Sequence, residues 1–226
     1  MTLVLFWDID GTLLTTARAG IVAWEDAAGE LVGRPVDFSR LETAGLTDVE
    51  IAARIPGIFG LEPTPERVEG LLRRYETQLP GRLRLRAGGV LPGVREIAEY
   101  LRGRPDICSL LLTGNTLAGA RAKLAHYGLD GYFGAGAFCD GTVDRPSIAR
   151  KALAMACDRI GLVPAPDRMY VIGDTPRDID CARAIGARAV AVASGAYTVD
   201  DLRAHEPWLA IERLPEPEAF LQRLNA

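Results

Sequence analysis

Two aspartates follow directly after an apolar run near the N-terminus. The run, residues 3–7, is short and rich in branched and aromatic side chains, which predicts a buried parallel strand that ends at Asp8 and Asp10. Residues two apart share one side of a strand, so both carboxylates point into the crevice where open α/β sheets bind ligands. Gly11 then permits a turn, and Thr12 adds a hydroxyl. Paired carboxylates favour a divalent cation, and the alternative is a polar strand exit without chemistry.

A second polar segment follows the apolar run 107–112. It consists of Thr113, Gly114 and Asn115, and apolar residues at helical spacing come after it. The segment therefore opens a helix, and its free N–H groups and the Thr113 hydroxyl could hold a phosphate. Simple capping by Asn115 or Thr116 accounts for the same residues.

A third segment of the same kind follows the apolar run 169–172. Asp174 stands at the expected strand exit, and Asp178 lies four residues further on. With Thr175 as N-cap and Pro176 at the first helical position, Asp178 would complete a capping box. Capping and support of a metal are compatible roles for Asp178.

The three segments, in this order, resemble the motifs of the haloacid dehalogenase-like superfamily of hydrolases, and the resemblance covers the whole chain. In that family the first aspartate is the nucleophile, the second is the general acid and base, and the threonine binds the phosphoryl group. The resemblance implies these roles for Asp8, Asp10 and Thr113. It also implies that the late acidic pair, Asp174 and Asp178, holds magnesium.

The family also uses a basic residue, commonly a lysine before a proline, and this sequence departs from that form. Lys123 and Lys151 are the only lysines, whereas Arg145 precedes Pro146 at the start of a helical pattern. We expect Arg145 to fill the role, because a guanidinium stays charged and can bridge the phosphate and the nucleophile. Lys151 lies a turn further into the helix and is the alternative.

Charge determines the chemistry that the resemblance implies. A phosphate dianion repels the Asp8 carboxylate, so attack requires that Mg²⁺, Arg145 and the loop at Thr113 neutralise the phosphoryl oxygens. Asp10 would protonate the leaving oxygen and later activate the water that hydrolyses the aspartyl-phosphate. The expected Mg²⁺ ligands are the Asp8 carboxylate, the Asp10 backbone carbonyl and Asp174. Asp178 would contact the ion either directly or through a water molecule.

Other reactions of the family bear on the assignment. Dehalogenation needs no acid for its leaving group, so Asp10 favours phosphate esters. Phosphonate hydrolysis in the family uses a cap lysine, and the expected cap has no lysine near it, which excludes that reaction here. A sugar phosphomutase uses the same catalytic set and stays open. A non-catalytic binding protein with this fold is the remaining alternative, although the complete acidic set argues against it.

The fold class expected is α/β: a Rossmann-like parallel sheet core flanked by helices, with an inserted α-helical cap domain. At 226 residues the chain exceeds the ~150 residues typical of one domain, and helical patterns dominate residues 16–87. We assign residues 1–15 and 88–226 to the core and 16–87 to the cap. The resemblance implies the small cap of the phosphoglycolate phosphatase-like branch, which covers the active site.

The cap supplies candidate substrate contacts. Thr47 and Asp48 stand in the loop 44–48, where capping alone also explains Thr47. A basic cluster near the end of the cap either is a solvated face or meets an acidic group of the substrate; it comprises Arg73, Arg74, Arg84 and Arg86. The residues expected to bind substrate are Gly11, Thr12, Thr47, Asp48, Thr113, Gly114, Asn115 and Arg145.

Length and composition agree with a cytoplasmic enzyme, and the family resemblance, with its small cap, implies that the substrate is a small phosphorylated metabolite. The net charge of −4 gives no general attraction to nucleic acid, and no apolar run reaches membrane-spanning length or resembles a signal peptide. The four cysteines lack metal-ligand spacing, which favours buried free thiols. The oligomeric state is not written in the sequence.

Overall fold

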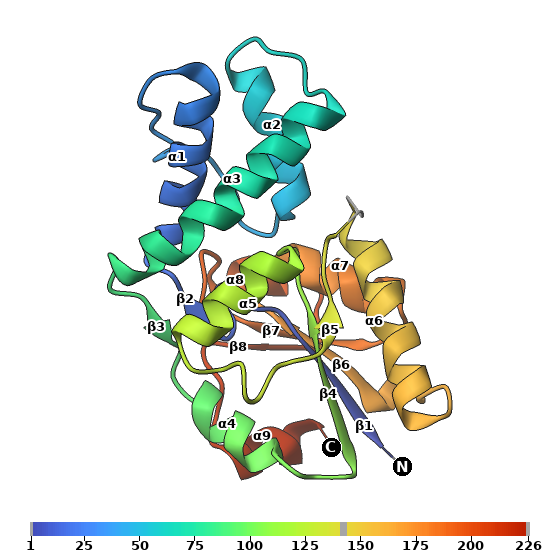
Figure 1. The fold of residues 1–226 in the computed structure, drawn as a ribbon. Helices are drawn as coiled ribbons and strands as arrows, with labels where there is room; N and C mark the ends of the chain where they lie inside the picture. The colour runs from blue at the N-terminus through green and yellow to red at the C-terminus, as the bar shows by residue number, and fades with distance from the viewer. Residues whose placement is uncertain (1, 141–143, 225–226) are drawn as a thin grey trace.

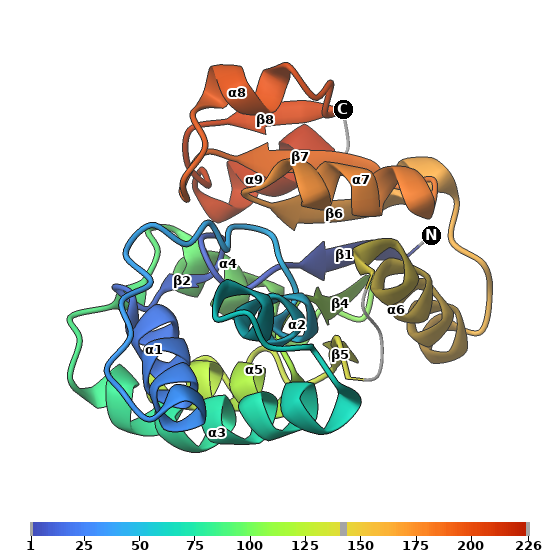
Figure 2. The same cartoon turned by 90° about the horizontal axis from the view of Figure 1, so that it is seen from above.

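The computed structural model describes residues 2–140 and 144–224, and a six-stranded parallel sheet lies at its centre (Figure 1). Its strands, in spatial order, are β5 (Gly136–Ala137), β4 (Ile107–Leu112), β1 (Leu3–Trp7), β6 (Met169–Gly173), β7 (Arg188–Val192) and β8 (Leu209–Ile211). Figure 2 shows these strands side by side in this order. The chain starts in the middle of the sheet and extends first to one side and then to the other. The switch point therefore falls at β1, where open α/β sheets bind their ligands.

Helices cover both faces of this sheet, as expected for the α/β class. They are α4 (Val94–Leu101), α5 (Leu117–His126), α6 (Arg145–Ile160), α7 (Pro176–Ala184), α8 (Val199–Arg203) and α9 (Pro217–Leu224), with a 3-10 helix at Pro166–Arg168. Strand alternation divides the core in two. Leu5 and Trp7 pack on the side of α4, α5 and α9, whereas Val4 and Phe6 pack on the side of α6 and α7.

Three further helices form a separate helical layer above the sheet (Figure 1). These are α1 (Ala19–Val32), α2 (Asp48–Ile58) and α3 (Pro65–Arg84). Their shared apolar cluster contains Trp24 and Tyr75, whose rings stack with centroids 4.0 Å apart. The chain enters and leaves this layer through a two-stranded antiparallel ribbon of β2 (Leu14–Thr15) and β3 (Gly89–Val90). The structure thus contains the expected helical cap, while its assigned bounds of 16 and 87 remain a prediction.

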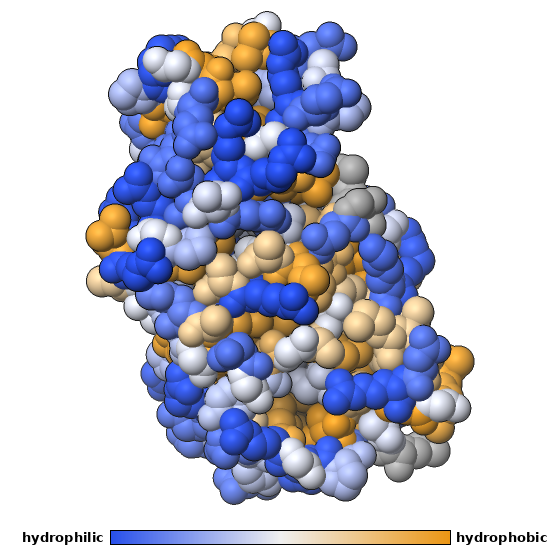
Figure 3. All heavy atoms as spheres, viewed as in Figure 1, coloured by the Kyte–Doolittle hydropathy of each residue, from blue (hydrophilic) through white to orange (hydrophobic). Residues whose placement is uncertain are grey.

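The remaining expectations concern the cysteines, membrane-spanning segments and the surface. All four cysteines are free, and three of them are buried. Within the described residues, the helices are too short or too polar to cross a membrane. On the face seen in Figure 3, hydrophilic residues predominate and hydrophobic residues lie in separate patches.

Candidate active site

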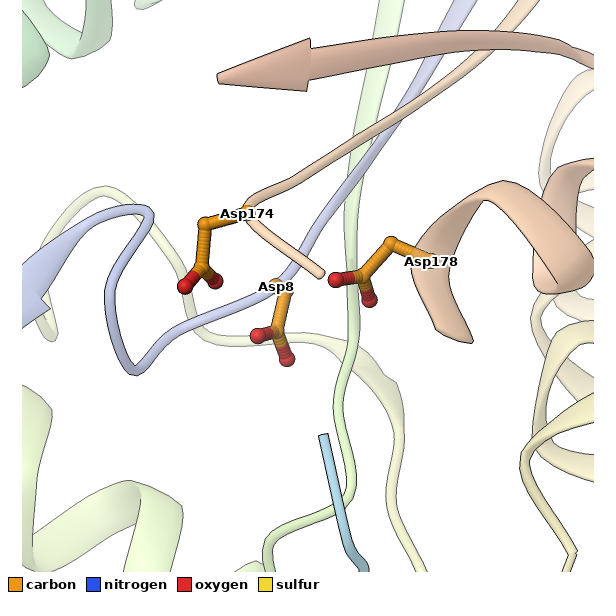
Figure 4. A group of neighbouring side chains, drawn as sticks. All are labelled: Asp8, Asp174 and Asp178. Carbon is orange, nitrogen blue, oxygen red and sulfur yellow. The ribbon is translucent and has the colours of Figure 1, made fainter. Parts of the chain in front are cut away.

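Three buried carboxylates meet where β1 and β6 end and α7 begins. Asp8 follows β1, Asp174 follows β6, and Asp178 lies in the first turn of α7. Each is at most 5% exposed, and each offers an oxygen that lies within 4.8 Å of the others. Figure 4 shows Asp8 between the other two. The sheet thus brings together residues that are far apart in the sequence.

Burial makes this cluster electrostatically costly. Loss of solvation raises the pKa of Asp8 to about 7, against the opposing attraction of Arg145. Burial, followed by repulsion from Asp178 and Asp8, raises the pKa of Asp174 to about 8. A nearby cation relieves both effects, and a donor set made only of carboxylate oxygens suits a hard ion such as Mg²⁺.

Two glycines, which have no Cβ atom, make room for the Asp174 side chain. A Cβ at Gly195 would lie 1.7 Å from Asp174 Oδ2, and a Cβ at Gly11, whose φ is +80°, would lie 2.3 Å from it. The Thr12 hydroxyl donates to Asp174 Oδ1 at 3.2 Å. The neighbouring backbone therefore forms a cradle around this carboxylate, and the residues fit a bound divalent cation.

Arg145 supplies a positive charge inside the cluster. It is the first residue of α6, whose N-cap Asp144 accepts from the Ser147 N–H. Its Nη2 donates to Asp8 Oδ1 at 3.2 Å and to Asp178 Oδ1 at 2.5 Å. Only 4% of Arg145 is exposed, and the two carboxylates keep its pKa raised against the opposing effect of burial.

The two alternatives for the basic residue occupy different surroundings. Lys151 lies on the exposed side of α6, where its ammonium is 3.4 Å from the Asp140 carbonyl oxygen. The structure therefore brings Arg145, and not Lys151, into contact with Asp8.

The loop after β4 lies beside Asp10. Thr113 is fully buried, and its Oγ accepts from Asn115 Nδ2 at 2.8 Å. The same amide nitrogen donates to Asp10 Oδ2 at 2.8 Å. Thr116 is the N-cap of α5 and accepts from the Gly119 N–H, so helix capping does not occupy the Asn115 side chain.

Lys123 is a site residue to which the sequence analysis gave no role. It lies on α5, is 4% exposed, and donates to Asp10 Oδ2 at 2.6 Å and to Asn115 Oδ1 at 2.5 Å. The sequence did hold a signal for its position. Lys123 lies seven residues after the N-cap Thr116, and that spacing places both residues on the same face of the helix.

Lys123 also corrects the argument against phosphonate hydrolysis. A lysine does lie next to the cap, because the Tyr75 hydroxyl of α3 interacts with Lys123. Burial alone would lower the pKa of Lys123, but the attraction of Asp10 raises it. A protonated amine has no lone pair for attack on a carbonyl, so the Schiff-base route remains disfavoured on this different ground.

Cap residues contact the loop 113–115 after β4 directly. Thr47 is buried and forms a capping box with Glu50, which explains its residue type by helix capping. Asp48 spans the two layers: its N–H donates to the Gly114 carbonyl at 2.7 Å, and its Oδ2 accepts from the Thr116 N–H at 2.8 Å. Burial raises the pKa of Asp48 to about 7, against the attraction of Lys123.

A cavity of about 390 Å³ connects these groups between the sheet and the cap. Of the expected site residues, it is lined by Asp8, Asp10, Gly11, Asp48, Thr113, Gly114, Asn115, Arg145 and Asp174. Thr12 donates to the lining carboxylate of Asp174, and Asp178 accepts from the lining guanidinium of Arg145. Within the described residues, Arg18 is the cap arginine that lines the cavity. None of the four arginines of the basic cluster lines this cavity. Arg73 pairs with Glu69 and Arg74 with Glu30, and the remaining two, Arg84 and Arg86, are exposed.

Comparison with known proteins agrees with the fold. The sequence profile of the haloacid dehalogenase-like hydrolases matches residues 2–186. The chain therefore belongs to the haloacid dehalogenase-like hydrolase family.

Curated relatives define the kind of enzyme further. The chain is 30% identical to the probable phosphatase IndB of Dickeya dadantii, with 95% of this chain and 90% of that protein covered. It is also 30% identical to a phosphoglycolate phosphatase of Synechococcus elongatus, with 98% and 96% covered. The enzyme class that these relatives and the family support is a phosphatase.

Solved structures share the whole fold. A hydrolase from Pseudomonas syringae is 23% identical and has a TM-score of 0.72, with 100% of this chain and 98% of that chain covered. CbbY from Rhodobacter sphaeroides, solved in complex with phosphate, is 19% identical with a TM-score of 0.75 and full coverage of both chains. At these identities the likeness concerns the fold.

Proposed function

We propose that this chain is a Mg²⁺-dependent phosphatase that hydrolyses a small phosphate monoester through an aspartyl-phosphate on Asp8. The observation that carries the proposal is the position of Asp8, which lies between two further carboxylates and in contact with Arg145. A buried carboxylate that borders a cavity, with cationic groups beside it, is arranged to attack an anionic phosphorus centre. Asp8, the Asp10 carbonyl, Asp174 and Asp178 would hold Mg²⁺, which supplies positive charge to the phosphoryl oxygens when bound.

The chain's own residues then perform two displacements. An Asp8 oxygen attacks phosphorus, the ester P–O bond breaks, and Asp10 gives its proton to the leaving oxygen. Asp10 next takes a proton from water as that water attacks phosphorus, and the Asp8 carboxylate is released. Arg145 and the loop at Thr113 would hold the phosphoryl oxygens during both steps.

The proposed substrate is a small phosphorylated metabolite. The cavity of about 390 Å³ lies beneath the cap, and Asp48 of the cap bonds to the N-terminus of α5 beside it. Such a space suits a small acid or sugar ester better than nucleic acid or a membrane surface. A relative that is a phosphoglycolate phosphatase supports the same size class. The cytoplasmic location and the proposed substrate contacts of Thr47 and Asp48 remain predictions.

Removal of the metal tests the proposal directly. Purified protein should hydrolyse an activated aryl phosphate with Mg²⁺, lose this activity in EDTA, and regain it when excess Mg²⁺ is added. The reason is that the carboxylate cluster repels the phosphate dianion unless a cation is bound. Phosphate release measured at a fixed enzyme concentration gives the result. Full activity in EDTA-treated enzyme would contradict the metal assignment.

A substrate panel tests the proposed size class. We expect kcat/KM for phosphoglycolate or a comparably small sugar or acid phosphate to exceed that for a phosphopeptide or a 5′-phosphorylated oligonucleotide. The cavity beneath the cap is small and must exclude bulk water during the reaction, so bulky esters should be excluded. A higher value for either macromolecular substrate than for every small metabolite would refute this. Transfer of phosphate to a second sugar hydroxyl would instead identify a phosphomutase.

A further inference from the structure

The side chain of Asp10 is held at one of its two oxygens. In the part of the chain that the structure describes, this side chain accepts two hydrogen bonds, both at Oδ2: from Asn115 Nδ2 at 2.8 Å and from Lys123 Nζ at 2.6 Å. Lys123 also donates to Asn115 Oδ1 at 2.5 Å, so the three side chains form a closed triangle. The Asp10 side chain remains 41% exposed and borders the cavity, whereas that of Lys123 is only 5% exposed.

We propose that Lys123, together with Asn115, positions Asp10 for proton exchange with the leaving group. This inference rests on the phosphatase function proposed above. With Oδ2 held by two donors, Oδ1 is the oxygen left to carry the proton toward the cavity. Lys123 is a positioning residue in this scheme, because it acts through Asp10 and not on the substrate.

The proton transfer balances at these atoms. As the ester P–O bond breaks, the O–H bond at Asp10 Oδ1 breaks and a new O–H bond forms on the leaving oxygen. The negative charge left on Asp10 is shared with Oδ2, where the ammonium and the amide stabilise it. In the second displacement the proton of the attacking water returns to Oδ1. A carboxyl group free to rotate would spend part of its time in orientations that cannot reach the leaving oxygen.

The cap takes part in this arrangement. The Tyr75 hydroxyl interacts with Lys123, and the Asp48 carboxylate attracts the same ammonium. Lys123 therefore bonds to side chains of the core and interacts electrostatically with side chains of the cap. Its position on the regular helix α5 keeps the ammonium in place with little loss of side-chain freedom during the reaction.

The test compares Lys123→Met with the wild-type enzyme on two small substrates with different leaving groups. An alkyl phosphate needs protonation of its leaving oxygen, whereas p-nitrophenyl phosphate does not. We compare kcat/KM, which covers only the steps up to formation of the aspartyl-phosphate. We expect a loss of about 100-fold on the alkyl phosphate and of less than about tenfold on the aryl phosphate. Asp10→Asn should show the same selectivity, and the double variant should lose little more on the alkyl ester than Asp10→Asn alone.

Controls separate positioning from general disruption. Lys151→Met removes an exposed lysine of α6 and should leave both values unchanged. Lys123→Arg keeps a cation and should restore part of the alkyl phosphate activity; if Lys123→Met does not fold, Lys123→Gln replaces it. Equal losses on both substrates would overturn the positioning role alone. A wild-type enzyme that hydrolyses neither ester with Mg²⁺ would overturn the proposed function as well.

Discussion

Asp8→Asn should lower kcat for an aryl phosphate by at least about a thousandfold, because an amide oxygen does not form the proposed covalent intermediate. The fold should survive, since the amide has nearly the shape of the carboxylate. The substitution also removes a carboxylate whose burial raises its pKa to about 7. A raised pKa means that ionisation of Asp8 costs folding free energy, and the amide does not ionise. The measurement is steady-state turnover, with thermal unfolding of the metal-free protein expected at an equal or higher temperature.

Asp106→Asn is the matched control for this substitution. Asp106 is an exposed aspartate before β4 that pairs with Arg104, so the same chemical change there should leave turnover unaltered. Retention of more than about a tenth of wild-type turnover by Asp8→Asn would assign the nucleophile to another group.

Arg145→Ala should lower turnover by about 100-fold or more, as is typical when a charge partner of the transition state is lost. The structural reason is that Arg145 bonds to both Asp8 and Asp178 while almost fully buried. Its removal leaves those carboxylates without their protein cation, at a cost of about 3–5 kcal/mol of folding stability in the metal-free protein. Added Mg²⁺ should recover more stability in this variant than in the wild type. Kinetics and thermal unfolding with and without Mg²⁺ give both quantities.

Lys151→Ala serves as the control on the same helix, where the side chain faces solvent beside the Asp140 carbonyl. It should change turnover by less than about twofold. If Lys151→Ala were the more damaging variant, the basic role would move to Lys151.

Local pattern was sufficient for the framework of the site. The apolar run 3–7 and the polar residues after it predicted β1 and the exit at Asp8, because strand periodicity and turn residues act over a few positions. Helix starts could likewise be predicted from a few neighbouring residues. The capping predicted for Thr47 is present, with Glu50 as its partner, and so is the capping box predicted at Thr175 with Asp178, since each depends on residues three apart.

Sequence alone therefore determined the α/β class and the order of the acidic segments at the strand ends, and the family resemblance supplied the roles expected of them. It did not determine which side chains meet across the layers. Lys123 lies 113 residues from Asp10, and its role as a partner depends on how α5 packs against β1 and the cap. Asp48 reaches the Thr116 N–H across 68 residues for the same reason. Such contacts depend on the packing of whole elements, so only the tertiary structure decided that a lysine bonds to the proposed acid and that a cap aspartate bonds to the start of α5.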